Sequence, residues 1–201
     1  MQDNYARLVR QNLDRLYDNL PQELEHWLPA RCEGNSYAFT AFGQACVIRP
    51  EGILLDGHPA ESIHAILISL YALHANPSAC QDQPFRAFKE FPNSAPYIGA
   101  FASHTEQPLV NKVPQLEAAQ PQLMAALDGE AAPAALGGDF AFVLTPLPKI
   151  RLCYIFHRAD EDFPAAVTCL FSSNADRFLP LDGLADVGEY TTRRLTALSE
   201  P

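Results

Sequence analysis

The spacing of hydrophobic residues predicts two long helices that differ in how much polar surface they carry. Over residues 3–20 apolar side chains fall on one stripe and charged side chains fill the rest, which is typical of an amphipathic helix, and Pro21 ends it. A second helix is expected from Pro59, a residue suited to the first helical position, to about residue 74. Because this helix is apolar nearly all round, we expect it at the centre of the fold, packed on a sheet and covered by other elements.

Alternation of apolar and polar residues predicts two blocks of three short strands. The first block is a meander with Gly43-Gln44 and Pro50-Glu51-Gly52 as its turns. The second block follows Gly137-Gly138, and prolines at its strand ends suit an antiparallel ribbon. The six expected strands cover residues 36–42, 45–49, 53–55, 140–144, 150–156 and 166–171.

The remaining segments are expected to be helical or irregular. Residues 84–96 contain Phe85, Phe88 and Phe91, each three positions from the next, which fits a short helix or an aromatic-lined loop. Residues 97–101 and 110–127 favour helices, residues 128–135 favour a loop, and Asp182 is a good N-cap for a last helix. This order has no strand–helix–strand alternation. We therefore predict an α+β fold with a largely antiparallel sheet in two three-stranded blocks and helices packed around the central apolar helix.

Composition places the chain among soluble globular proteins. It has 201 residues, 48% hydrophobic and 19% charged, which suffices for one core, and we predict a single domain over residues 1–201. The net charge of −10 repels a phosphate backbone, so nucleic acid is not expected as a partner. The N-terminus lacks the apolar run of a signal peptide, and residues 63–73 fall short of the roughly 20 residues of a membrane span. We expect a cytoplasmic protein.

The five cysteines do not form a metal-binding pattern. Their number is odd and no two have the C-x-x-C spacing of zinc or iron–sulphur sites, so no metal is predicted. Cys46, Cys153 and Cys169 lie in strand-like runs, where we expect them to be buried as small hydrophobic side chains.

Three stretches of the chain carry a resemblance to a family. The first is the apolar helix over residues 66–73, and the second is the aromatic segment over residues 85–93. The third and most specific runs from Gly138-Asp139 through the acidic residues 160–162 to Gly188-Glu189. Over roughly residues 20–198 the chain resembles the bacterial family called domain of unknown function 3786.

The resemblance implies a stand-alone domain of uncharacterised role. Members of this family occur in anaerobic bacteria and archaea, and some are fused to iron–sulphur or corrinoid-related modules. This chain departs from those fusions because it lacks cluster-binding cysteines. The resemblance carries no catalytic residues over to this sequence.

Polar residues at the ends of the C-terminal strands are the candidates for acid–base chemistry. Asp160 and Glu161 follow a strand, where such carboxylates bind a cation, act as acid and base, or cap a solvated turn. Asp139 either points into a pocket or bonds its own backbone. Lys149 lies in a turn, as a solvated charge or as an ionic partner of Asp139 or Asp160. For an enzyme, we expect Asp139 and Asp160 to converge in one concave site.

Aromatic and cationic residues interleave in the middle of the chain, at Phe85, Arg86, Phe88 and Lys89, with Tyr97 beyond them. Such a stretch suits a pocket wall for a flat anionic ligand, by stacking and charge pairing. The alternative is a hydrophobic cluster beneath a long loop.

Two histidines, His58 and His64, bracket the start of the apolar helix. One imidazole is enough for an axial ligand, so a haem or corrinoid is a candidate cofactor. The alternative is that both are structural histidines held by hydrogen bonds.

Three classes of function remain open. The first is a small-molecule binding or accessory protein, with a tetrapyrrole-type metallo-cofactor as one candidate ligand. The second is a metal-independent acid–base enzyme, and the third is a protein–protein adaptor with an apolar surface patch. The first two depend on one expectation: that the C-terminal ribbon folds back on the apolar helix and encloses a cleft beside the aromatic segment.

Overall fold

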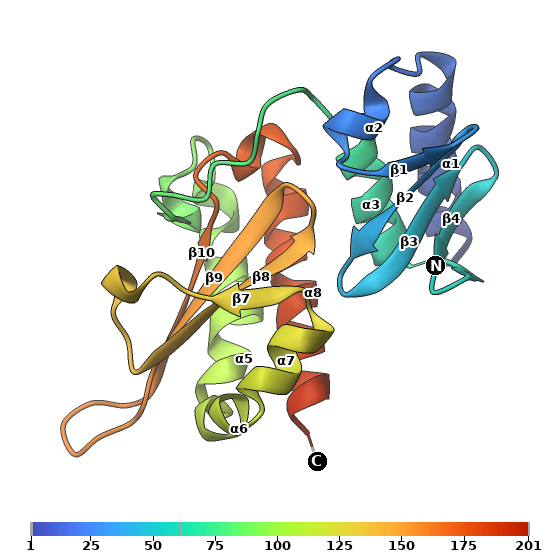
Figure 1. Cartoon of the computed structure of the whole chain (residues 1–201). Coiled ribbons are helices and arrows are strands. Elements are labelled where there is room, and N and C mark those ends of the chain that lie inside the picture. The colour runs from blue at the N-terminus through green and yellow to red at the C-terminus, as the bar shows by residue number, and fades with distance from the viewer. Residues whose placement is uncertain (1, 61, 201) are drawn as a thin grey trace.

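The first block of strands forms a five-stranded antiparallel sheet with two helices, α1 and α3, on one face (Figure 1). The computed structural model describes residues 2–60 and 62–200. The strand order is β1-β2-β3-β4-β5, so each strand pairs with its sequence neighbour. The elements of this N-terminal half are α1 (Gln2–Asp18), α2 (Leu24–Trp27), β1 (Arg31–Glu33), β2 (Ser36–Ala41), β3 (Gln44–Arg49), β4 (Gly52–Leu55), β5 (His58–Pro59) and α3 (Ile63–Leu73).

The apolar helix α3 is central, as its composition predicts. Its buried side chains include Leu67, Ile68 and Tyr71, and the Tyr71 ring meets Phe39 of β2 at a centroid distance of 6.1 Å. On its other sides α3 packs against α1 and against the last helix of the chain. The sheet and two helices therefore cover it, which is why it needs no polar face.

The second block of strands forms another five-stranded antiparallel sheet, in the order β6-β10-β9-β8-β7. Helices from the middle of the chain and α8 lie behind it in Figure 1. Its strands are β6 (Arg86–Ala87), β7 (Gly129–Ala131), β8 (Phe140–Leu147), β9 (Ile150–His157) and β10 (Ala166–Phe171). Its α-helices are α4 (Ile98–Phe101), α5 (Gln107–Val110), α6 (Val113–Ala118), α7 (Gln120–Ala126) and α8 (Leu181–Ser199). Short turns of other helix types are the 3-10 helices η1 (Phe88–Glu90), η2 (Ala95–Tyr97), η4 (Ala134–Leu136) and η5 (Ala175–Arg177), and the π-helix η3 (Ala102–Glu106).

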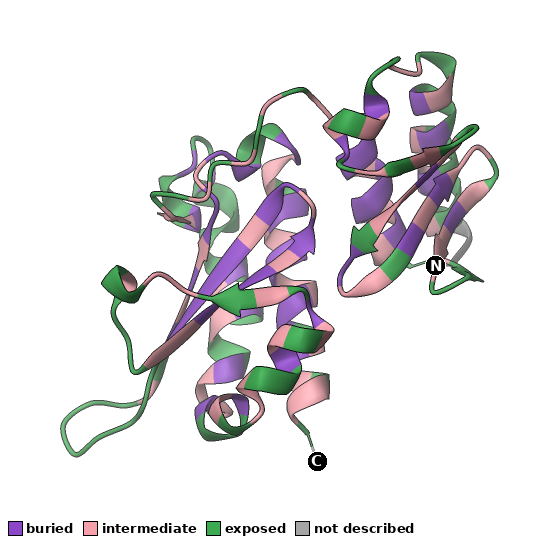
Figure 2. Ribbon diagram, viewed as in Figure 1, coloured by how far each residue is buried: buried purple, intermediate pink, exposed green. Residues whose placement is uncertain are grey.

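This second sheet is buried on both faces along its central strands (Figure 2). Tyr154 of β9 points toward α8, where its hydroxyl lies 3.3 Å from Thr192 Oγ1. On the opposite face Val143, Cys153 and Ile155 form a small cluster that Phe85 covers. Cys46, Cys153 and Cys169 are buried free cysteines, as expected.

The two halves meet at the tip of the β2–β3 hairpin. Phe42 and Gly43 form this tip with φ of 52° and 75°, the backbone of a tight two-residue turn. The Phe42 amide donates a hydrogen bond to Pro146 O at 2.7 Å, and a Cβ on Gly43 would overlap Ala126 O. One hydrophobic cluster runs through both halves. A single domain over residues 1–201 stays a prediction.

The predicted α+β class is confirmed, with differences at the sheet edges. All six predicted strands form, but the short strands β1, β5, β6 and β7 extend each three-stranded block to five strands. Two- and three-residue strands carry too little alternation to be read from a sequence.

Two predicted helix starts are wrong. Pro59 belongs to β5, because Asp56-Gly57 adopts positive φ at both residues and turns the chain back to pair with β4. The helix α3 begins only at Ile63. Asp182 lies in the first turn of α8, and Pro180 takes the N-cap position.

Candidate functional site at a π-helical turn

The predicted acid–base carboxylates lie near one end of the C-terminal sheet, and two of them, Asp139 and Asp160, accept hydrogen bonds from backbone amides. Asp139 Oδ2 accepts a hydrogen bond from the Arg158 amide at 2.7 Å, and the Arg158 guanidinium binds Glu117 through two nitrogens. Asp160 Oδ1 accepts hydrogen bonds from the amides of Asp162 and Phe163, so it caps the turn between β9 and β10. Glu161 is exposed beside it. Asp160 thus has the turn-capping role that stood as the alternative to catalysis, whereas Asp139 bonds the backbone of Arg158 rather than its own.

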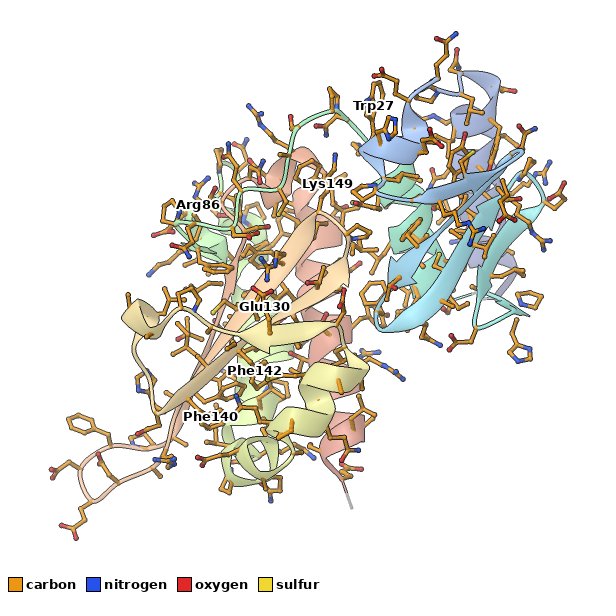
Figure 3. The ribbon with its side chains drawn as sticks, viewed as in Figure 1. Trp27, Arg86, Glu130, Phe140, Phe142 and Lys149 are labelled. Atoms are coloured by element: carbon orange, nitrogen blue, oxygen red, sulfur yellow. The ribbon has the colours of Figure 1, made fainter. Side chains whose placement is uncertain are left out.

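Lys149 lies at the opposite end of the β8–β9 hairpin (Figure 3). Strands of eight residues separate it from Asp139 by about 25 Å, so the two do not share a site. Its ammonium is buried and donates hydrogen bonds to Asn76 O at 2.8 Å and Ser78 O at 2.9 Å. Burial lowers the pKa of Lys149. Lys149 therefore anchors the segment over residues 74–85 that connects the two halves.

The aromatic stretch lies mostly in the core. Phe88 stacks on Phe101 with ring centroids 4.5 Å apart, and Phe91 packs edge-on against Phe171. The Arg86 guanidinium lies 4.7 Å from the centre of the Phe91 ring and donates a hydrogen bond to the Ser173 carbonyl. Its planar face and its N–H groups therefore already have partners within the protein.

Three residues of that stretch have other surroundings. Phe85 packs on the second face of the sheet, and Tyr97 is 37% exposed. Lys89 is exposed at the rim of a hollow of about 240 Å³ that Phe88 also lines.

The histidines predicted as axial ligands do not fit a tetrapyrrole. His58 is exposed on the edge strand β5. His64 is held between Phe42 and Tyr190, at ring distances of 5.1 and 4.8 Å, and burial lowers its pKa. Neither histidine lines any of the hollows described below. Residues 2–60 and 62–200 also contain no cluster of three His, Cys, Asp or Glu suited to a metal.

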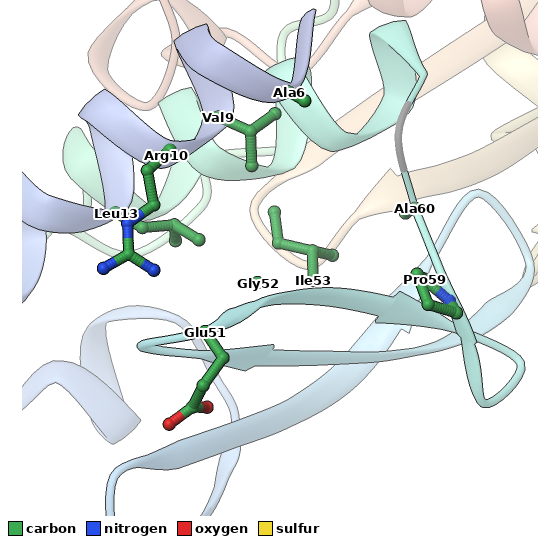
Figure 4. Close-up of a pocket in the computed structure, with 9 residues that line it drawn as sticks. All are labelled: Ala6, Val9, Arg10, Leu13, Glu51, Gly52, Ile53, Pro59 and Ala60. Atoms are coloured by element: carbon green, nitrogen blue, oxygen red, sulfur yellow. The ribbon is translucent and has the colours of Figure 1, made fainter. Parts of the chain in front are cut away.

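The expected shared cleft is divided into separate hollows. The acidic turn borders one of about 520 Å³, lined by Val113, Pro164 and the Glu117–Arg158 pair. The aromatic stretch borders the 240 Å³ hollow, which has none of those residues. The N-terminal half has a crevice of about 180 Å³ between α1 and β4, where Glu51 points away from the helix (Figure 4). Its lining is largely apolar, and Arg10 is paired with Asp14.

The π-helical turn η3 stands between two hollows. Its residue Glu106 faces the 240 Å³ hollow, and its residue His104 faces a groove of about 500 Å³ along α8. A π-helix is rare and is frequently found at functional sites, because the extra residue per turn redirects side chains. We therefore take this turn as the centre of the candidate site.

Close packing against α8 holds the π-helical turn in place. Gly188 of α8 allows the approach, since a Cβ there would lie 2.7 Å from a Phe101 ring carbon and 2.9 Å from Thr105 Oγ1. Thr192 donates a hydrogen bond to the Thr105 carbonyl at 2.7 Å. The Tyr154 hydroxyl also lies within hydrogen-bond distance of Thr192 Oγ1 and Gly188 O, so the turn is tied to the centre of the sheet.

The 500 Å³ hollow, which we call the His104 groove, contains a histidine oriented by a carboxylate. His104 Nδ1 lies 3.1 Å from Glu189 Oε2, and the Arg193 guanidinium pairs with Glu189 Oε1. The Glu189 side chain is 19% exposed, whereas that of His104 is 58% exposed and can reach a ligand. The groove is further lined by Ser103, Pro108, Thr192, Thr196, Ala197 and Glu200.

The sequence did not point to these residues. His104 and Glu189 are 85 positions apart, so no local spacing connects them. The one signal was that Gly188-Glu189 ends the most specific stretch of the family resemblance.

Comparison with known proteins settles the family. A family model described as "Domain of unknown function (DUF3786)" matches residues 21–194. The chain belongs to this family. The match to the DUF3786 family includes both sheets, the π-helical turn, and His104, Glu189 and Arg193. No curated protein and no solved structure matches the chain. Among the described helices, none has the length and hydropathy that a bilayer span requires.

Proposed function

We propose that the protein binds a small amphipathic molecule in the His104 groove and uses His104 as a general base. The observation that supports this most directly is the 3.1 Å contact between His104 Nδ1 and Glu189 Oε2 within a groove of about 500 Å³. Ligand pockets typically have volumes of about 300–1,000 Å³, so the groove is large enough for a small substrate.

The carboxylate fixes which ring nitrogen can act. An ionised Glu189 only accepts hydrogen bonds, so His104 must donate through Nδ1–H, which leaves the lone pair of Nε2 free for the groove. A proton taken up at Nε2 makes an imidazolium, and the adjacent carboxylate stabilises its charge. Glu189 is thus a positioning residue for His104.

Two hydroxyls of the groove, those of Ser103 and Thr192, are committed to backbone carbonyls. Ser103 Oγ donates a hydrogen bond to Gly99 O at 2.7 Å, and Thr192 Oγ1 donates to Thr105 O. The proton that His104 accepts therefore belongs, in this proposal, to a water molecule or to the substrate. Arg193, 63% exposed at the side chain, provides a cation at the groove edge for an anionic group of the ligand.

The proton position can be tested by NMR of the imidazoles. We expect His104 to be in the Nδ1–H tautomer in the wild type, and Glu189→Ala to shift it toward Nε2–H, the tautomer favoured by a histidine side chain in water. His26 is an internal control, because it lies 3.7 Å from Glu25 on α2, is 76% exposed and borders no described hollow. An unchanged His104 tautomer in Glu189→Ala contradicts the proposed orientation.

Catalysis can be tested with an activated amphipathic ester, p-nitrophenyl butyrate. If His104 is the general base, His104→Gln lowers the hydrolysis rate above background by about 10²–10⁴-fold. His26→Gln, the matched control, leaves the rate unchanged. Equal rates for the two variants would exclude His104 as the base.

A further inference from the structure

The 240 Å³ hollow on the other side of the π-helical turn, which we call the Glu106 hollow, has its own chemistry. It lies beside β10 and is lined by Phe88, Lys89, Ile98, Phe101, Glu106 and Thr168. It shares no residue with the His104 groove, and nothing in the proposed function uses it.

Glu106 is positioned by the part of the β10 edge that is not paired with β6. The short strand β6 pairs with β10 only at Leu170 and Phe171, so the Cys169 amide on that edge has no strand partner. Glu106 Oε1 accepts a hydrogen bond from this amide at 2.9 Å. The Glu106 carboxylate thus accepts the hydrogen bond that the carbonyl of a neighbouring strand would otherwise accept. The sheet therefore fixes the orientation of this carboxylate.

The second carboxylate oxygen is left to the hollow. Glu106 Oε2 has no hydrogen-bond partner within the described part of the chain, although the residue is half-buried. Lys89 is the nearest cation, but it is exposed and its ammonium does not come within ion-pair distance of Glu106 among the described contacts. A partly desolvated carboxylate without a counter-ion favours a cationic ligand.

The walls specify what kind of cation fits. Phe88 and Phe101 form an apolar wall, and Ile98, 37% exposed, forms part of the rim. A Ca²⁺ ion requires about six to eight oxygen ligands, which one carboxylate and one threonine do not provide. The hollow has a volume of about 240 Å³. A ligand with an ammonium group on a hydrocarbon body of that size would pair with the Glu106 charge and pack against the apolar wall.

We propose that the Glu106 hollow is a binding site for a small organic ammonium ion, with Glu106 Oε2 as its counter-ion and the Phe88–Phe101 wall against its hydrocarbon part. Lys89 at the rim weakens this binding by like-charge repulsion. The site is independent of the chemistry proposed at His104.

The test uses benzylamine as the probe, titrated at neutral pH into the full-length protein by calorimetry and NMR. Benzyl alcohol and benzoate are the neutral and anionic controls of the same shape. We expect saturable binding of benzylamine, with the largest amide shifts at Thr168 and Cys169, and at least about tenfold weaker binding of both controls.

Two variants locate the charge. Glu106→Gln keeps an oxygen for the Cys169 amide but removes the negative charge, and should weaken benzylamine binding about tenfold or more. Lys89→Gln, on the exposed rim, should tighten it by about threefold. Glu161→Gln, an exposed carboxylate in the acidic turn, is the charge-matched control and should bind like the wild type.

Three results would overturn the proposal: benzylamine that does not saturate, benzoate that binds as well as benzylamine, or the same affinity in Glu106→Gln, Lys89→Gln and wild type. His104→Gln should bind benzylamine normally, so failure at one site is distinguishable from failure at the other.

Discussion

At the scale of the residue, Glu106 has a carboxyl group whose surroundings penalise its charge. Burial raises its pKa above the ordinary value of 4.5, while the Cys169 amide and Lys89 act in the opposite direction. The folded chain therefore holds this proton at pH values where the unfolded chain has lost it. Between those two pKa values unfolding releases a proton, so the free energy of unfolding falls as pH rises.

This linkage gives a pH prediction for Glu106→Gln. The variant lacks the titration, so the free energy of unfolding of the wild type should decline relative to it from about pH 4.5 upward. Urea unfolding of both proteins between about pH 4 and about pH 7 measures the difference. Glu117→Gln is the control of opposite sign, because Arg158 lowers the pKa of Glu117, and that stabilisation is lost as pH falls. Parallel curves for Glu106→Gln and wild type would contradict the assignment.

Charged residues near strand ends were recognisable in the sequence, but their roles were not. Lys149 and Asp160 each meet free backbone groups, carbonyls in one case and amides in the other. Turns and connections expose such groups, and a nearby charge satisfies them. His104 is different, because its partner Glu189 is brought to it only by the packing of η3 on α8.

At the scale of the element, the π-helical turn depends on one small residue of α8. Gly188 leaves room for Phe101 and Thr105, and the next residue, Glu189, then meets His104. The sequence predicts helix over residues 97–101 and 110–127 but cannot show the π-helical turn between them, because the extra residue of that turn is set by the helix it packs on.

We expect Gly188→Ala to cost about 1–3 kcal/mol of unfolding free energy and to separate His104 from Glu189. Urea unfolding measures the first effect, and the His104 tautomer reports the second. Gly99→Ala is the matched control: it is also helical, but nothing lies within 4 Å of its new Cβ, so we expect a gain of about 0.5–1 kcal/mol. Equal effects of the two substitutions would show that the approach at Gly188 is not tight.

The long elements were predictable for a physical reason. Strands β2, β3, β8, β9 and β10 each have six or eight residues, enough alternation to show a buried face. The helices α1 and α8 show a buried stripe for the same reason, and α3 shows a continuous apolar run. Short edge strands form only because a longer strand already offers its free groups.

At the scale of the whole molecule, the two halves are fitted together at Gly43. Its φ of 75° disfavours a side chain, and its contact with the Ala126 carbonyl leaves no room for one. The adjoining hydrogen bond from Phe42 to Pro146 joins the tip of one sheet to the other.

Gly43→Ala should therefore destabilise both halves together. Positive φ costs about 1–2 kcal/mol for a residue with a Cβ, and the overlap adds about 1–3 kcal/mol. Gly34→Ala separates the two effects, because Gly34 has a φ of 62° but nothing within 4 Å of its Cβ. Urea unfolding should give the larger loss for Gly43→Ala; a similar loss in both variants would mean that the halves do not rely on this contact.

The anchoring of the connecting segment has a consequence for the integrity of the chain. Lys149 fixes Asn76 and Ser78, and the Asn174 side chain bonds to the backbone of Ala79 and Gln81. Side chains of the C-terminal half thus hold the connecting segment at several points. The hydrogen bond from Phe42 at the tip of the β2–β3 hairpin joins the two halves independently of that segment. The two halves are therefore held together without an intact backbone in the connecting segment. A molecule cleaved within that segment would keep the contacts on both sides of the cut.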